Sequence, residues 1–158
     1  MRLERLEHLS DLPAAEWNAL VPDHHPFLAH VFLNALERHG CVGAAVGWHP
    51  WHITCRDDNG RLLGAAPLYL KTHSYGEFVF DWGWAEAYRR QGLPYYPKLV
   101  SAIPYTPVTS PRLLLMPNQP HPQQTAQAIV NFTLEECRRH RLPSSHWLFP
   151  APVDLEPL

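Results

Sequence analysis

The sequence predicts a single α/β domain, more closely of the α+β class, in which helices flank a mixed and mostly antiparallel sheet. Residues 51–71 have the pattern of a β-hairpin, and two later stretches have the apolar spacing of amphipathic helices. A chain of 158 residues is long enough to bury one hydrophobic core. Seventeen prolines indicate many irregular connections and argue against a helical bundle.

The first half of the chain is expected to contain one strand, two helices and the hairpin. Ser10 and Pro13 suit the start of a helix, Gly40 suits a helix end, and Asp57-Asp58-Asn59-Gly60 is a strong turn signal. In order, we expect a strand at 1–9, a short helix after Pro13, a helix at 28–39, a loop at 43–50, and strands at 51–56 and 61–71.

The second half is expected to end in a long helix and a strand. His121-Pro122 begins a helix that continues to Arg141, with one inner apolar face. The predicted elements are a strand near 78–80, a short helix at 85–91, a partly extended segment at 105–115, the helix, and a strand at 145–149. Residues 1–150 are therefore expected to form one domain, and residues 151–158 a tail.

Composition excludes several classes of protein. A formal net charge of -2 argues against a protein that mainly grips nucleic acid backbone. The charged N-terminus is no signal peptide, and no apolar run is long enough for a membrane span. Three cysteines at unrelated spacings fit a reducing compartment better than a disulfide framework. These features predict a cytoplasmic location.

The segment from Tyr75 to Trp82 has the strongest chemical character, because aromatic and acidic residues alternate along it. In an extended strand, Tyr75, Glu77 and Asp81 would share one face and line the wall of a polar-ligand site. Glu77 and Asp81 would then stand roughly 13 Å apart, too far to act as a carboxylate pair on one bond. The alternative is an edge strand whose polar face meets water.

Cations and further aromatic residues surround this segment. Arg112 could bind phosphate or carboxylate as a bidentate fork, whereas Lys71 is expected on the surface. Trp82 is expected in the core. Other aromatic side chains could stack on sugar or amide planes, namely Trp84, Tyr88, Tyr95 and Tyr96.

Metal and nucleophile sites are weakly supported. The best metal candidates are Cys41, His49, His52 and Cys55, but their spacing is unlike common zinc patterns. Cys41 follows a helix end, where negative partial charge disfavours a thiolate, and Cys137 lies on a predicted core face. No metal or nucleophile is therefore predicted.

Three motifs carry a resemblance to a known family. The stretches H-S-Y-G-E-F-V-F-D-W-x-W, Y-Y-P-K-L and P-Y-T-P-V-T-S-P-R-L-L resemble the FemAB-like family of peptidoglycan biosynthesis or recognition proteins. The likeness extends from about Leu12 to Phe149. That family is related to the Fem aminoacyltransferases and, by fold, to GNAT N-acyltransferases. The resemblance implies a GNAT-like acyl-CoA N-acyltransferase fold and transfer of an acyl or aminoacyl group to an amine.

The chain departs from these relatives in three respects. Residues 116–122 contain three prolines and no glycine, where GNAT enzymes have the glycine-rich loop that holds coenzyme A. We therefore expect no cofactor. Ser110 stands where the family usually has glycine. Fem-type proteins carry two acyltransferase-like domains, and this chain resembles only the first, without its C-terminal end. Truncation, a homo-oligomer or a partner that supplies the rest would each explain this.

The resemblance implies an acceptor-binding half of an acyl- or aminoacyltransferase, and this half need not be active alone. The acyl donor would be aminoacyl-tRNA or another acyl carrier, and the acceptor would resemble a peptidoglycan precursor. Glu77 or Asp81 would orient or deprotonate the amine. The substrate-binding candidates are His73, Tyr75, Trp84, Tyr95, Tyr96, Lys98, Thr109 and Arg112. The alternative is a non-catalytic module that binds a precursor or another polar ligand through the same face.

Overall fold

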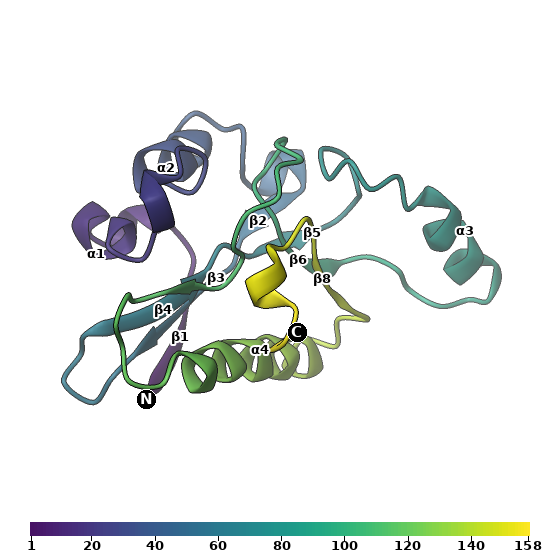
Figure 1. Cartoon of the computed structure of the whole chain (residues 1–158). Coiled ribbons are helices and arrows are strands. Elements are labelled where there is room, and N and C mark those ends of the chain that lie inside the picture. Colours follow the sequence, from purple (N-terminus) through teal and green to yellow (C-terminus); the bar gives the residue numbers. More distant parts are fainter.

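The computed structural model describes residues 1–158 and contains two four-stranded sheets (Figure 1). The first has the order β1 (Arg2–Leu6), β3 (His52–Arg56), β4 (Leu62–Ala66) and β7 (Leu114–Leu115). The second has the order β2 (Trp48–Pro50), β5 (Tyr69–Lys71), β6 (Lys98–Ser101) and β8 (Ser145–Trp147). All neighbours are antiparallel except β6 and β8, which are parallel. The mixed α+β class is confirmed, but the expectation of one sheet is wrong.

The predicted hairpin crosses from one sheet to the other. Trp51 separates β2 from β3, and Pro67-Leu68 separates β4 from β5. Pro67 has no N–H and cannot continue a strand ladder, so the predicted strand at 61–71 is split. The Trp51 N–H donates to the Leu68 carbonyl (2.8 Å) and ties the two bends together. Part of the expected loop at 43–50 is therefore strand β2.

The turn between β3 and β4 forms as its residue types require. The Asp57 carboxylate accepts hydrogen bonds from the main-chain N–H groups of Asn59 and Arg61, each at 2.9 Å. Gly60 has φ +85°, a conformation that favours glycine. The predicted hairpin turn is confirmed.

Helices cover both faces of the first sheet (Figure 1). Helices α1 (Ala14–Asn18) and α2 (His30–Arg38) lie on one side and bury Trp17 and Leu33 against Leu62. Helix α4 (Pro122–Arg139) lies on the other side and packs Ile129 against Ile53. Short 3-10 turns occur at Leu9–Asp11, Pro22–His24, Ala44–Val46 and Pro152–Asp154. The helices predicted from periodicity are confirmed, but the predicted start at Ser10 is wrong, because α1 begins after Pro13 and no side chain caps it.

The segment between β5 and helix α3 (Trp82–Arg90) is irregular, so the strand predicted near Phe78 is wrong. Gly76, Phe78 and Phe80 have φ values of +80°, +61° and +51°, which no extended strand contains. A Cβ at Gly76 would meet the Tyr105 ring at 2.7 Å, so both space and conformation require glycine there. The aromatic and acidic side chains of this segment therefore do not alternate between two faces.

The last eight residues pack onto the domain. The buried Asp154 carboxylate accepts hydrogen bonds from the main-chain N–H groups of Arg112 and Leu113, at 2.7 and 3.3 Å.

Helix α3 stands away from both sheets (Figure 1). No helix in the chain combines the length and hydrophobicity needed to cross a bilayer.

Candidate functional site

Both lysines of the chain are fully buried at the base of helix α3. Lys71 on β5 pairs with Lys98 on β6 in the antiparallel register. Two cations placed opposite each other on neighbouring strands repel, and burial removes the water that would screen them. The sequence expectation that Lys71 lies on the surface is wrong. Such an arrangement requires compensating negative charge nearby.

Two carboxylates provide that charge from the irregular segment. Lys98 Nζ donates to Glu77 Oε2 (2.9 Å) and to Asp81 Oδ2 (2.6 Å). Lys71 Nζ lies 3.9 Å from Glu77 Oε1 and donates to the Tyr75 carbonyl (3.1 Å). Its ammonium also lies over the Trp48 ring, 3.8 Å from the ring centre. The four charges balance, and the two acids meet at one ammonium instead of standing apart along a strand.

Three hydroxyl groups complete the arrangement. Ser74 Oγ accepts a hydrogen bond from Lys98 Nζ (3.1 Å) and lies 2.6 Å from the Tyr96 hydroxyl. The Tyr95 hydroxyl donates to Asp81 Oδ2 (2.6 Å). We call this group the Lys98 cluster and define it as Lys71, Ser74, Glu77, Asp81, Tyr95, Tyr96 and Lys98.

The two acids of the cluster differ in proton affinity. Burial alone would raise the pKa of Asp81, but hydrogen bonds led by that from Lys98 outweigh it and hold the pKa at about 2. Burial raises the pKa of Glu77, and Lys98 opposes this shift only in part. Burial lowers the pKa of Lys71 to about 8. Asp81 is thus a firmly ionised anion, while Glu77 holds a proton more readily.

The cluster leaves two carboxylate oxygens without hydrogen bonds. Glu77 Oε1 and Asp81 Oδ1 are buried and have no donor. Unpaired buried acceptors are uncommon in native proteins and mark places where a ligand or water completes the site. Of these two residues, only Asp81 lines a cleft. Asp81 is therefore the acid of the cluster that borders a cleft.

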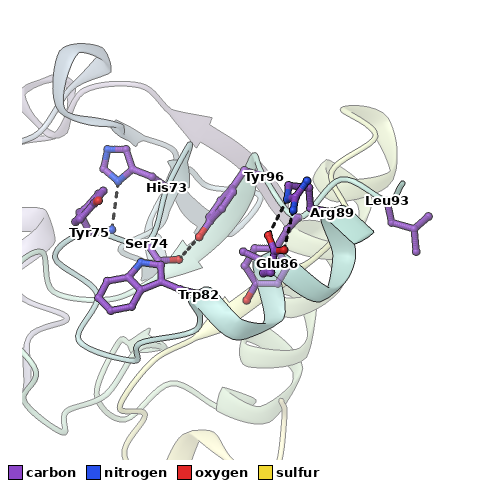
Figure 2. A pocket seen from close by; sticks show the side chains of 10 residues that line it. His73, Ser74, Tyr75, Trp82, Glu86, Arg89, Leu93 and Tyr96 are labelled. Carbon is purple, nitrogen blue, oxygen red and sulfur yellow. Dashed lines mark hydrogen bonds and ion pairs between the residues drawn. The ribbon is translucent and has the colours of Figure 1, made fainter. Parts of the chain in front are cut away.

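One cleft, the Ser74 cleft, lies between helix α3 and the segment that precedes it (Figure 2). Its volume is about 480 Å³. The Ser74 and Tyr96 hydroxyls face one another in its wall, and Glu86 and Arg89 of α3 are ion-paired beside it at 2.7 Å (Figure 2). Its lining residues are His73, Ser74, Tyr75, Trp82, Ala85, Glu86, Arg89, Leu93, Tyr95 and Tyr96.

A second cleft, the His146 cleft, also has a volume of about 480 Å³ and has Tyr95 in common with the first. Asp81 is its only carboxylate, and no lysine or arginine lines it. Four aromatic side chains surround this anion, an arrangement that suits a cationic ligand. Its lining residues are Val79, Phe80, Asp81, Trp84, Tyr88, Tyr95, Ser144, His146 and Leu148.

A comparison with protein families decides the relationship suggested by the motifs. The profile of the FemAB-like family, described as peptidoglycan biosynthesis/recognition, matches residues 8–158. This chain is a FemAB-like protein. The resemblance inferred from the three motifs is therefore confirmed. A search of curated proteins and a search of solved structures each gave no match, so no structural neighbour confirms the GNAT-like fold.

The FemAB-like chain gathers most, but not all, of the site residues predicted from its sequence. Glu77, Asp81, Tyr95, Tyr96 and Lys98 belong to the Lys98 cluster. His73 and Tyr75 line the Ser74 cleft, and Trp84 lines the His146 cleft. The Tyr75 side chain is two-thirds exposed whereas Glu77 and Asp81 are buried, so the predicted common face is wrong. Trp82 is half-exposed, so the expectation that it lies in the core is wrong.

Arg112 and Thr109 lie elsewhere. Arg112 is fully buried and donates to the carbonyls of Leu148 (2.7 Å) and Val108 (2.9 Å) and to Ser110 Oγ (2.6 Å). Burial lowers its pKa to about 10. Thr109 is exposed, and neither residue lines either cleft. The candidate site therefore does not border Arg112.

Sequence reasoning missed Ser74 and His146 as site residues, and it misplaced Lys71. Ser74 lies in an irregular segment, and His146 lies far along the chain on a short strand. The composition did point to Lys71. The chain has eleven arginines but only two lysines, which suggests that lysine stands where arginine would not serve.

No group of three or more His, Cys, Asp or Glu side chains lies close enough together to hold a metal ion.

Proposed function

We propose that this chain is the acceptor-binding half of a FemAB-like N-acyltransferase, which transfers an acyl or aminoacyl group to an amine. The observation that carries the proposal is Asp81, which the Lys98 cluster holds in the wall of an aromatic cleft and whose Oδ1 has no hydrogen-bond donor. An amine acceptor at neutral pH arrives as an ammonium ion and needs an anion to bind it. The family description supports an acceptor related to peptidoglycan precursors.

Asp81 suits the acceptor site for electrostatic reasons. Its low pKa keeps it ionised throughout the physiological range, and its second oxygen is fixed by Lys98 and Tyr95. The rings of Trp84 and Tyr88 in the same cleft would stabilise an ammonium by cation–π attraction, which contributes about 0.5–2 kcal/mol in proteins. An ammonium group is therefore favoured over a neutral or anionic ligand.

The Ser74 cleft suits the acyl donor. A transferase must bring two ligands together, and the two clefts have the Tyr95 side chain in common. Of the Ser74 and Tyr96 hydroxyls, the one that does not donate to the other could donate a hydrogen bond to an acyl carbonyl as it gains negative charge, with the Lys98 ammonium nearby. The donor would be an aminoacyl-tRNA ester or another acyl carrier, and its supply places the reaction in the cytoplasm.

The test is an acyl-transfer assay with charged tRNA as donor and a soluble peptidoglycan precursor with a free side-chain amine as acceptor. Mass spectrometry would detect the amide product, and calorimetry would measure binding of each ligand. We expect Asp81→Asn to weaken acceptor binding by about 10- to 100-fold, since hydrogen bonds to charged groups are worth about 1.5–3 kcal/mol. Asp11→Asn, at an exposed carboxylate outside both clefts, is the control.

A second function is a non-catalytic module that recognises the same precursor. The family description includes recognition, and the Asp81 oxygen would serve a binding module equally well. Binding of the precursor that depends on Asp81, without amide formation from any donor, would support this reading. If neither the precursor nor a simple ammonium ion binds, both functions are excluded.

A further inference from the structure

Strand β8 brings a histidine to the cleft that Asp81 lines. Residues alternate in direction along a strand, so Ser144, His146 and Leu148 all reach the same cleft. In the parallel register His146 lies beside Val100 of β6, two residues beyond Lys98. The histidine ring also packs edge-on against Tyr95, with ring centres 6.0 Å apart. The histidine is thus next to the proposed acceptor site.

The groups already assigned to the site are unsuitable for deprotonating a bound amine. Asp81 has a pKa of about 2, so it holds an ammonium well but removes a proton from it poorly. Glu77 has the higher proton affinity, but it is buried behind Lys98 and lines neither cleft. Lys71 is likewise fully buried and lines neither cleft. The base must come from another side chain of the His146 cleft.

We propose that His146 is the proton acceptor for the amine that Asp81 holds in this cleft. Its Nε2 lies 2.9 Å from Ser144 Oγ, and Nδ1 has no hydrogen-bond partner in the chain. If Nε2 donates to Ser144, the lone pair is on Nδ1 and is available to a ligand. This inference rests on the proposed acyltransferase function, and it adds a residue that acts directly on the acceptor.

The surroundings of His146 keep the ring neutral. Burial lowers the pKa of His146, the positive charge of Lys98 lowers it further, and the negative charge of Asp81 only partly opposes them. The other polar groups that face it are the hydroxyls of Ser144 and Tyr95, which are uncharged at neutral pH. A neutral imidazole is the form that accepts a proton.

The proposed reaction is the attack of the acceptor amine on an acyl ester. The acceptor ammonium gives one proton to His146 Nδ1, and the freed nitrogen lone pair attacks the carbonyl carbon of an acyl ester in the adjoining cleft. A C–N bond forms, the C–O bond of the ester breaks, and a second proton from nitrogen passes to the departing alkoxide. His146 then releases its proton to water. The net products are an amide, an alcohol and one proton.

The first test needs no turnover. Nitrogen-15 NMR of the histidine rings would be recorded at pH 7 with n-butylammonium as the probe and n-butyltrimethylammonium, which has no N–H, as its matched control. We expect a neutral His146 with its proton on Nε2, and a shift of Nδ1 on addition of n-butylammonium but not of the control ion. The shift should disappear in Asp81→Asn.

The outcomes separate this inference from the proposed function. If n-butylammonium perturbs Asp81 and Trp84 but leaves His146 Nδ1 unmoved, the inference fails and the acceptor site stands. A cationic His146 at pH 7, or a proton on Nδ1, also overturns the inference alone. If neither ion perturbs any residue of the cleft, the acceptor site fails and the inference fails with it.

A second test uses the transfer reaction. His146→Gln should lower kcat by about 10²-fold or more with little change in KM, and the loss of rate below the histidine pKa should disappear from the pH profile. His146→Gly should regain activity when imidazole is added, which a purely structural role would not predict. His121→Gln, an exposed histidine outside both clefts, is the control. An unchanged kcat in an active enzyme would exclude the proposed role.

Discussion

Arg112 and Lys98 are both fully buried cations, yet their surroundings differ. Arg112 directs its side-chain donors to two main-chain carbonyls and one hydroxyl, and no cleft reaches it. Lys98 is bound by two carboxylates, each of which keeps one oxygen free of donors. Arg112 therefore joins the 108–112 segment to β8 and stabilises the fold. The Lys98 cluster is incomplete by itself and is the better candidate for ligand binding.

The chemistry of the two side chains explains why Arg112 and Lys98 have different surroundings. Arginine makes several directional hydrogen bonds at once, so it can satisfy itself inside a protein with carbonyl groups. Lysine is a compact point charge and needs anionic partners when it is buried. A buried lysine therefore draws carboxylates together, and here each of the two carboxylates keeps one buried oxygen without a donor.

The largest effect should come from Lys98→Met. Removing this ammonium leaves Glu77 and Asp81 buried without their common partner, and breaking a buried ion pair costs about 3–5 kcal/mol. We expect urea unfolding to show a loss of this size in the free energy of unfolding. Arg61→Met, at an exposed cation, should change it little. A Lys98→Met protein as stable as the wild type would contradict the view that the cluster is electrostatically balanced by Lys98.

Arg112→Lys should have a smaller effect on stability, and it tests whether Arg112 serves the fold and not ligand binding. Lysine cannot reach all three acceptors, so buried carbonyls lose their donors at a cost of about 1–3 kcal/mol. Urea unfolding should show this loss, while n-butylammonium binding to the folded protein stays unchanged. A binding constant that fell together with stability would show that the two buried cations are not separate in function.

The smallest expected effect is the contribution of Asp81 to the pH dependence of the free energy of unfolding. Its pKa is about 2 in the folded chain and about 3.9 in the unfolded one. The unfolded state thus binds the proton more tightly, so Asp81 adds about 2.6 kcal/mol of stability above pH 4 that is lost as the pH falls towards 2. The difference in unfolding free energy between wild type and Asp81→Asn should shrink over this range. Both proteins should also carry Glu77→Gln, because the charge of Asp81 helps to raise the pKa of Glu77 and the titration of Glu77 would not cancel in that difference.

A difference that stays constant from pH 6 to pH 2 would contradict this assignment. It would mean that Asp81 has the same proton affinity in the folded and unfolded chains, and that Lys98 and Tyr95 do not hold it ionised. The measurement also serves the functional proposal, because an acceptor site built on a permanently ionised Asp81 depends on the same low pKa.

Several elements of this protein follow from local sequence alone. The amphipathic spacing in α2 and α4, the cap signals at their ends and the Asp57–Gly60 turn each depend on residues close together in the chain, and all three predictions are confirmed. The three motifs were likewise sufficient to identify the family. Such features can be predicted because the interactions that produce them span only a few residues.

The arrangement of the site residues, in contrast, is decided by the tertiary structure. Alternating residues between Tyr75 and Trp82 indicated a strand, but left-handed backbone at Gly76, Phe78 and Phe80 breaks the alternation. The opposed Lys71 and Lys98 draw Glu77 and Asp81 to one place because uncompensated buried charge is costly. His146 joins them only through the parallel pairing of β8 with β6. Contacts across long stretches of chain decide these positions, and residue spacing carries no information about them.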